Sequence, residues 1–211
     1  SDALSFSDAL YLLYERGEAM QAAVPVGKGS MIAVLGLKIN EIKNIINSRK
    51  DKKGICEIAN DNADGQVIIS GERDAIQSLQ NSLKEKKIKS IPLKVSAPFH
   101  CSLMKPAAEI MKEKINKIRF NDPLFAIINN VTAKVEKDSN IIKKLLIDQI
   151  FSTVRWRESL VNMSETGIKN FVEIGPGKAL TGMVKRTIKN ANCFSINSIA
   201  DIKNFKNEFK K

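Results

Sequence analysis

The sequence lacks any long apolar run, any close pair of cysteines and any repeated or low-complexity tract. No stretch approaches the ~18 consecutive apolar residues of a membrane-spanning helix, because even Met31–Leu37 ends at Lys38. The three cysteines are widely spaced and form no Cys-x-x-Cys pair that would bind a metal or cycle between redox states. We therefore expect a cytoplasmic protein in a reducing compartment, without a membrane segment and without a bound metal.

What is present is an ordinary globular composition with an excess of positive charge. The 211 residues are 43% hydrophobic and 27% charged, which excludes a disordered tail and a collagen-like fibre. Lys and Arg number 34 against 23 for Asp and Glu, so the net charge is +11. Such a field attracts polyanions and acidic proteins. Composition alone therefore leaves a nucleic acid, a phosphorylated substrate or an acidic protein as partners.

A compact block at residues 27–96 alternates strand and helix patterns in the order βαββαβ. This order predicts a ferredoxin-like small subdomain. A turn is expected at Asn60–Gly65. The strands are expected at Met31–Leu37, Ile55–Ala59, Gln66–Ser70 and Lys89–Val95, with one helix from Asn40 and another through Ile76, Leu79 and Leu83.

An RNA-binding domain of this type would carry aromatic residues on its central strands for base stacking. Neither Gln66–Ser70 nor Ile55–Ala59 contains an aromatic residue. We therefore expect no nucleic-acid partner, despite the positive charge.

Longer helices and short apolar strands flank this block on both sides. A first helix at Ser7–Ala22, with Ser7 as its N-cap, carries Leu10, Leu13 and Tyr14 at helical spacing. Further helices are expected at 103–118, 141–150 and 179–188, and strands at Leu124–Ile128 and Phe171–Ile174. Strands separated by helices favour a parallel sheet. We predict an α/β fold in which residues 1–26 and 97–211 form a hydrolase-like large subdomain around the inserted small one.

Two residues stand out as candidates for chemistry. His100 is the only histidine and lies where an extended segment meets a helix, a common place for reactive groups in α/β folds. Arg16 lies on the first helix, where its guanidinium could hold a carboxylate through two parallel hydrogen bonds. The local sequence alone favours a structural role for His100 and a surface position for Arg16, paired with Glu15 or Glu18.

Other glycine-rich segments carry less information. Gly27–Ser30 lacks the residue order of a phosphate-binding loop, and the sequence contains no Gly-x-Ser-x-Gly motif. Gly175–Gly177 joins a strand to a helix, so backbone amides there could face an anion, although a tight turn is the commoner reason for such glycines.

Four stretches, taken together and in order, resemble the bacterial malonyl-CoA:acyl-carrier-protein transacylases of type II fatty acid synthesis. They are residues 14–21 (YERGEAMQ), 60–71 (NDNADGQVIISG), 95–104 (VSAPFHCSLM) and 172–182 (VEIGPGKALTG), which together span nearly the whole chain.

The resemblance implies a ping-pong transfer in which a serine takes malonyl from coenzyme A and passes it to the phosphopantetheine thiol of an acyl carrier protein. His100 matches the general base of this family, and Gln149 matches the position whose backbone carbonyl orients the histidine. Arg16 matches the arginine that pairs with the malonyl carboxylate, and Asn60 and Asn62 fall in a segment expected to bind substrate. Coenzyme A is then a substrate, and we expect no cofactor, an acidic carrier protein as partner, and a monomer.

The resemblance also implies a Gly-His-Ser-Leu-Gly elbow with the nucleophilic serine and a Gly-Gln-Gly-Ser-Gln loop, neither of which this sequence contains. We expect both before Ser1, the serine roughly ten residues upstream of it. Two alternatives remain. One is an inactive fragment that only binds carrier protein or coenzyme A. The other is an acyltransferase domain of polyketide type, for which the bulky Phe99 indicates an unbranched acyl group.

Overall fold

A computed structural model describes residues 1–49 and 52–209. The chain divides into two compact units, Ser1–Trp156 and Arg157–Lys211, and each is described by itself. The subdomain boundaries expected after residues 26 and 96 both fall within the first unit and stay predictions.

The first unit contains a four-stranded antiparallel sheet with the strand order β2-β3-β1-β4. Its strands are β1 (Gly29–Leu35), β2 (Cys56–Ala63), β3 (Gln66–Glu72) and β4 (Ser90–Pro92), with α2 (Ile39–Asn47) and α3 (Arg73–Glu85) between them. This strand order and these two helices confirm the predicted ferredoxin-like unit.

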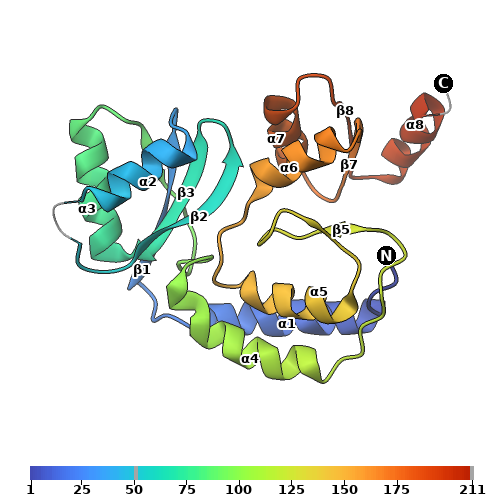
Figure 1. The fold of residues 1–211 in the computed structure, drawn as a ribbon, viewed down its shortest axis with the longest axis horizontal. Coiled ribbons are helices and arrows are strands. Elements are labelled where there is room, and N and C mark those ends of the chain that lie inside the picture. The colour runs from blue at the N-terminus through green and yellow to red at the C-terminus, as the bar shows by residue number, and fades with distance from the viewer. Residues whose placement is uncertain (50–51, 210–211) are drawn as a thin grey trace. The chain divides into compact units, whose positions relative to one another are not determined.

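The two faces of this sheet have different neighbours because successive side chains of a strand point in opposite directions. Ile32 and Val34 of β1 are buried against the helical residues Ile42 and Leu79, so α2 and α3 cover one face (Figure 1). Met31 and Ala33, which alternate with them, belong to a smaller cluster on the other face that Phe99 contacts. Residues near His100 therefore pack on the face opposite the helices.

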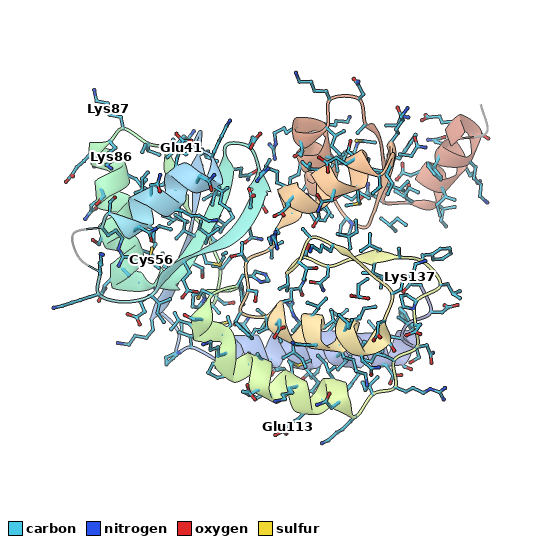
Figure 2. The ribbon with its side chains drawn as sticks, viewed as in Figure 1. Glu41, Cys56, Lys86, Lys87, Glu113 and Lys137 are labelled. Carbon is cyan, nitrogen blue, oxygen red and sulfur yellow. The ribbon has the colours of Figure 1, made fainter. Side chains whose placement is uncertain are left out.

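Side chains around the small sheet are buried or exposed according to their polarity. Cys56 is buried in the cluster beneath α2 and α3, whereas Lys86 and Lys87 at the end of α3 are exposed and point outward (Figure 2). Much of the chain's positive charge is carried by exposed lysines of this kind.

Strand β2 is longer than expected, because Asn60–Ala63 continue it instead of forming a turn. It lies at the edge of the sheet, where an unpaired strand normally ends early. Here, however, the Asp61 N–H donates to the Val154 carbonyl at 2.9 Å and the Val154 N–H donates to the Ala59 carbonyl at 2.8 Å. The second partner compensates for irregular pairing with β3, and the turn shrinks to Asp64 and Gly65.

Three helices form the other part of the first unit. They are α1 (Phe6–Ala22), α4 (Lys105–Asn116) and α5 (Ser139–Asp148), and a 3₁₀ turn, η1 (Ser102–Met104), precedes α4. Helix α4 packs against both α1 and α5, and together they bury a core that includes Leu12, Met20 and Met111 (Figure 1).

The expected N-cap of α1 was wrong. Its N-cap is Ser5, whose Oγ accepts a hydrogen bond from the Asp8 N–H at 3.0 Å, while Ser7 lies within the first turn. Leu10, Leu13 and Tyr14 are exposed, because the face of α1 that packs on the core carries Leu12, Ala19 and Met20.

The segment expected to form a strand at Leu124–Ile128 is a strand only at β5 (Ile127–Ile128). It pairs antiparallel with β6 (Val135–Glu136), which the sequence did not predict, so it joins no parallel sheet among the described residues. Leu124 and Phe125 are exposed.

The second unit contains a parallel pair of strands, the type of pairing that the sequence predicted, but only one of its two strands had been predicted. Strands β7 (Asn170–Ile174) and β8 (Asn192–Ile196) pair in parallel, connected by α7 (Ala179–Thr187), with α6 (Trp156–Glu165) before them and α8 (Ile199–Phe209) after them. Elements α6, β8 and α8 had not been predicted. No helix among residues 1–49 and 52–209 is both long and apolar enough to cross a membrane.

Candidate active site

His100 lies in a tight turn between β4 and η1. Its φ is +58°, a left-handed conformation that costs a non-glycine residue on the order of 1–3 kcal/mol and persists only where neighbours enforce it. The Phe99 N–H donates to the Ala97 carbonyl at 3.1 Å, and the Cys101 thiol donates to the Pro98 carbonyl at 3.1 Å. The turn is thus closed on both sides of His100.

The imidazole of His100 is oriented by a backbone carbonyl. Its Nδ1 lies 3.0 Å from the carbonyl oxygen of Gln149, the residue that follows the last turn of α5. Carbonyls at a helix C-terminus have no partner within the helix, so this oxygen is available to accept. A carbonyl can only accept, which places the proton on Nδ1 and leaves Nε2 with a free lone pair.

Three features of the environment of His100 affect its pKa. Burial lowers its pKa, the hydrogen bond to the Gln149 carbonyl raises it, and the positive charge of Arg16 lowers it. The net direction is downward, so the ring is neutral at pH 7 and can take up a proton. This is the state that a general base requires.

Arg16 is half-buried on α1 and lines a cavity of about 290 Å³ together with Gln149. The remaining lining is apolar and comes largely from α1, α4 and α5. Burial lowers the pKa of Arg16, but a guanidinium keeps its charge in proteins. Among the described residues no carboxylate forms a salt bridge with Arg16, and Glu15 pairs instead with Lys114 at 2.7 Å. An arginine without a salt-bridge partner in a mostly apolar cavity is suited to bind an anionic ligand.

His100 also lines a second cavity, of about 350 Å³, formed with α2, β2 and the segment 151–153. Its charged lining residues are Lys43 and Glu57. The structure thus brings His100, Gln149 and Arg16 together at neighbouring cavities. Asn60 and Asn62 lie half-buried on β2 but line neither cavity, so their role in substrate binding stays a prediction.

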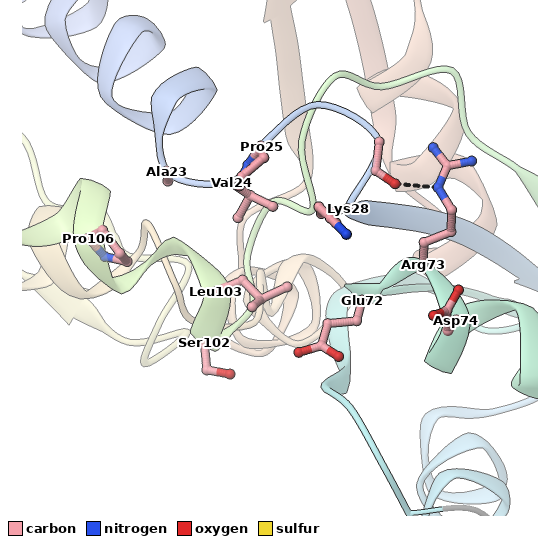
Figure 3. A pocket seen from close by; sticks show the side chains of 11 residues that line it. Ala23, Val24, Pro25, Lys28, Glu72, Arg73, Asp74, Ser102, Leu103 and Pro106 are labelled. Carbon is pink, nitrogen blue, oxygen red and sulfur yellow. Dashed lines mark hydrogen bonds between the residues drawn. The ribbon is translucent and has the colours of Figure 1, made fainter.

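A cavity larger than these two lies elsewhere in the first unit. A cavity of about 650 Å³ lies between the segment after α1, the start of α3 and the start of α4 (Figure 3). Its charged lining residues are Lys28, Glu72, Arg73 and Asp74. The Arg73 side chain donates a hydrogen bond to the Gly27 carbonyl. It is larger than the two cavities above but contains none of their three candidate residues, His100, Gln149 and Arg16.

In the helix that follows the turn Gly175–Gly177 in the second unit, two backbone amides are already occupied. The Glu173 carboxylate accepts from the N–H groups of Leu180 (3.1 Å) and Thr181 (2.7 Å), and these bonds lower the pKa of Glu173. The N-terminus of α7 is therefore capped by the chain's own carboxylate. No cluster of three or more His, Cys, Asp or Glu side chains suited to a metal occurs in residues 1–49 and 52–209.

Sequence comparison places these residues in a known family. The acyl transferase domain family matches residues 1–210, so the chain belongs to this family. Malonyl CoA-acyl carrier protein transacylase of Bacillus subtilis is 42% identical over 185 residues, or 87% of this chain and 58% of the relative. The enzyme of the same name from Haemophilus influenzae is 38% identical over 93% of this chain and 63% of the relative. The expected resemblance is confirmed.

Solved structures agree with the fold. The crystal structure of malonyl CoA-acyl carrier protein transacylase from Clostridium perfringens superimposes with a TM-score of 0.94 at 36% identity, covering 99% of this chain and 66% of that one. A malonyl-transacylase in complex with a type II PKS acyl-carrier protein gives 0.92 at 35% identity, with 98% and 67% covered. The α/β prediction is confirmed, and the chain spans 58% and 63% of the length of the two curated relatives above.

Proposed function

We propose that this chain carries the general base, its orienting carbonyl and the acyl-binding arginine of a transferase that moves malonyl from coenzyme A to an acyl carrier protein. The observation that carries the proposal is the hydrogen bond of 3.0 Å between His100 Nδ1 and the Gln149 carbonyl, beside a half-buried Arg16. A neutral base with a fixed tautomer and a fixed cation nearby are two of the groups that transfer of an anionic acyl group needs, beside the nucleophile.

In the first half of the reaction, Nε2 of His100 takes the proton of the attacking hydroxyl as its oxygen bonds to the thioester carbonyl carbon. The carbon–sulfur bond then breaks, and the proton passes from the imidazolium to the departing coenzyme A sulfur. In the second half the carrier-protein thiol gives its proton to Nε2 and its sulfur bonds to the acyl carbon. The carbon–oxygen bond to the enzyme then breaks, and the imidazolium returns the proton to that oxygen, which restores the hydroxyl. The nucleophile is a serine by resemblance to the family. Coenzyme A is then a substrate, and the proposal includes no cofactor.

The Gln149 carbonyl takes the place that an aspartate occupies in Ser-His-Asp enzymes. It fixes the tautomer and stabilises the imidazolium through a partial charge rather than a full one. A weaker partner suits a base whose pKa is already lowered by burial and by Arg16, because both keep the ring neutral between turnovers.

Selectivity for malonyl follows from Arg16. The guanidinium forms two parallel hydrogen bonds with a carboxylate, which malonyl has and acetyl lacks. When acetyl occupies the cavity, the half-buried arginine stays unpaired, and an unsatisfied polar group there lowers affinity.

The carrier protein enters the proposal through charge. Carrier proteins of this family are acidic by the resemblance, and the net charge of +11 would speed their encounter with this chain. The related complex with a type II PKS acyl-carrier protein favours polyketide synthesis as a second candidate pathway for the same chemistry. We also infer a cytoplasmic location and a monomer.

The test compares malonyl with acetyl transfer by the natural polypeptide that carries this sequence. Arg16→Ala should lower malonyl transfer about a hundredfold, because a charge pair in a partly dry site is lost, while acetyl transfer changes little. Arg16→Lys, which keeps the charge but not the two-pronged geometry, should lie between. An equal loss for both acyl groups would contradict the role of Arg16.

A further inference from the structure

We propose that Glu57 is a positioning residue for His100, and that strand β2 holds the histidine and its orienting carbonyl in register. Such a support is needed because of where His100 and Gln149 lie in the fold. His100 lies in a loop, Gln149 follows the end of a helix, and 49 positions separate them. Neither belongs to a regular ladder that would fix a distance of 3.0 Å between them.

The first contact joins β2 to the segment of His100. The Glu57 carboxylate accepts from the Ser102 N–H at 2.8 Å with one oxygen and from the Ser102 hydroxyl at 2.7 Å with the other. Ser102 begins η1 two residues after His100. Hydrogen bonds to a charged acceptor are stronger than neutral ones, and two of them to one carboxylate also restrict the rotation of Ser102 relative to Glu57. These two hydrogen bonds therefore limit how far the backbone at His100 can move.

The second set of contacts joins the same strand to the segment of Gln149. The Thr153 hydroxyl donates to the Ile58 carbonyl at 2.6 Å, and the next residue, Val154, exchanges backbone hydrogen bonds with Ala59 and Asp61 of β2. Through Glu57, Ile58, Ala59 and Asp61, strand β2 thus contacts both the segment that follows His100 and the segment that follows Gln149. Because β2 is itself paired with β3, it provides a rigid common support.

The position of Glu57 agrees with this role. Glu57 and His100 line the same cavity of about 350 Å³, yet no hydrogen bond between the two side chains is formed. Its effect on the histidine is therefore carried by Ser102 and the backbone. The inference rests on the proposed function only where activity is measured, because the geometry of His100 can be followed directly.

The test uses the natural polypeptide with ¹⁵N-labelled histidine, and the His100 ring signals are assigned by their loss in His100→Asn. In the unaltered protein the signals should show one tautomer, protonated on Nδ1. Glu57→Ala should give a mixture of tautomers or exchange-broadened signals, and kcat for malonyl transfer should fall about tenfold to a hundredfold with little change in KM. Glu57→Gln, which keeps the size and one acceptor oxygen, should restore part of both.

Two further variants keep the test decisive. Ser102→Ala removes only the hydroxyl donor and should shift the signals less than Glu57→Ala, and it carries the test if the latter fails to fold. Glu72→Gln makes the same change of charge at an exposed residue ending β3 and should leave the signals and kcat unchanged.

The outcomes separate this inference from the proposed function. Unchanged His100 signals in Glu57→Ala or, if that variant fails to fold, in both Glu57→Gln and Ser102→Ala would overturn the positioning role, whatever happens to activity. Altered signals in a polypeptide that never transfers malonyl would uphold the positioning role and reject the proposed function.

Discussion

At the scale of single residues, Arg16 has two separate effects on the candidate site. Its charge is available to a carboxylate ligand, and the same charge lowers the pKa of His100. One residue therefore links acyl selectivity to the state of the base. The two effects can be separated, because a lysine keeps the charge without the geometry of a guanidinium.

The pH dependence of transfer should reveal this link. Only the neutral imidazole accepts a proton, so kcat/KM should fall as the pH drops through the pKa of His100, below the ordinary value of about 6.5. Removing the positive charge in Arg16→Ala should raise that pKa and move the acidic limb to higher pH. Arg16→Lys should leave the limb in place. Profiles of kcat/KM against pH for the three proteins measure this, and a limb that stays fixed in Arg16→Ala would contradict the coupling.

Residue types determined how much of the site could be predicted. His100 stood out because it is the only histidine, whereas Arg16 is one of seven arginines; for both, the family resemblance was needed to assign the role. Gln149 acts through a carbonyl that every residue possesses, so only the family resemblance pointed to it. Glu57 was missed because a single acidic residue in a strand carries no signal until the fold brings Ser102 to it.

At the scale of elements, strand β2 depends on a close approach that only glycine allows. A Cβ atom on Gly71 of β3 would lie 1.9 Å from the carbonyl oxygen of Ile55, just before β2. Real Cβ atoms are never this close to a backbone oxygen, so the strands would have to separate. Because β2 supports both halves of the candidate site, this spacing matters for chemistry as well as for stability.

Gly71→Ala should therefore lower the free energy of unfolding by about 3 kcal/mol or more, in the range of strongly overpacked sites. Its ladder partner Ser30 provides the control, because Ser30→Ala at a half-buried position should change stability by no more than about 0.5 kcal/mol. Urea unfolding of both variants is the measurement. Equal stabilities for the two would show that the strands can separate without loss.

Helices and strands were predicted well where their sequence pattern is local. They were predicted poorly where a residue distant in the sequence determines how far the element extends. The βαββαβ order follows from periodicity within each segment, and the structure confirms it. The extension of β2 through Asn60–Ala63 depends on Val154, about ninety positions away, which no local pattern reveals. The N-cap moved from Ser7 to Ser5 because two serines two residues apart are equivalent as sequence signals.

At the scale of the whole molecule, family membership and fold class agree with each other and with the arrangement of the site. The family match covers residues 1–210, and solved relatives superimpose over nearly the whole chain. The candidate residues His100, Gln149 and Arg16 all lie in the first compact unit, which contains the small sheet and the three-helix core. The second unit adds the parallel β7–β8 pair.

The most direct measurement is intact-protein mass spectrometry of the natural polypeptide before and after incubation with malonyl-CoA. The central claim is that His100, oriented by Gln149, activates a hydroxyl that becomes acylated. We expect the mass to rise by one malonyl group and to return to its starting value on addition of carrier-protein thiol, and His100→Ala should nearly abolish the adduct at neutral pH. A polypeptide that gains no malonyl group, or an adduct that forms equally well in His100→Ala, would contradict the claim.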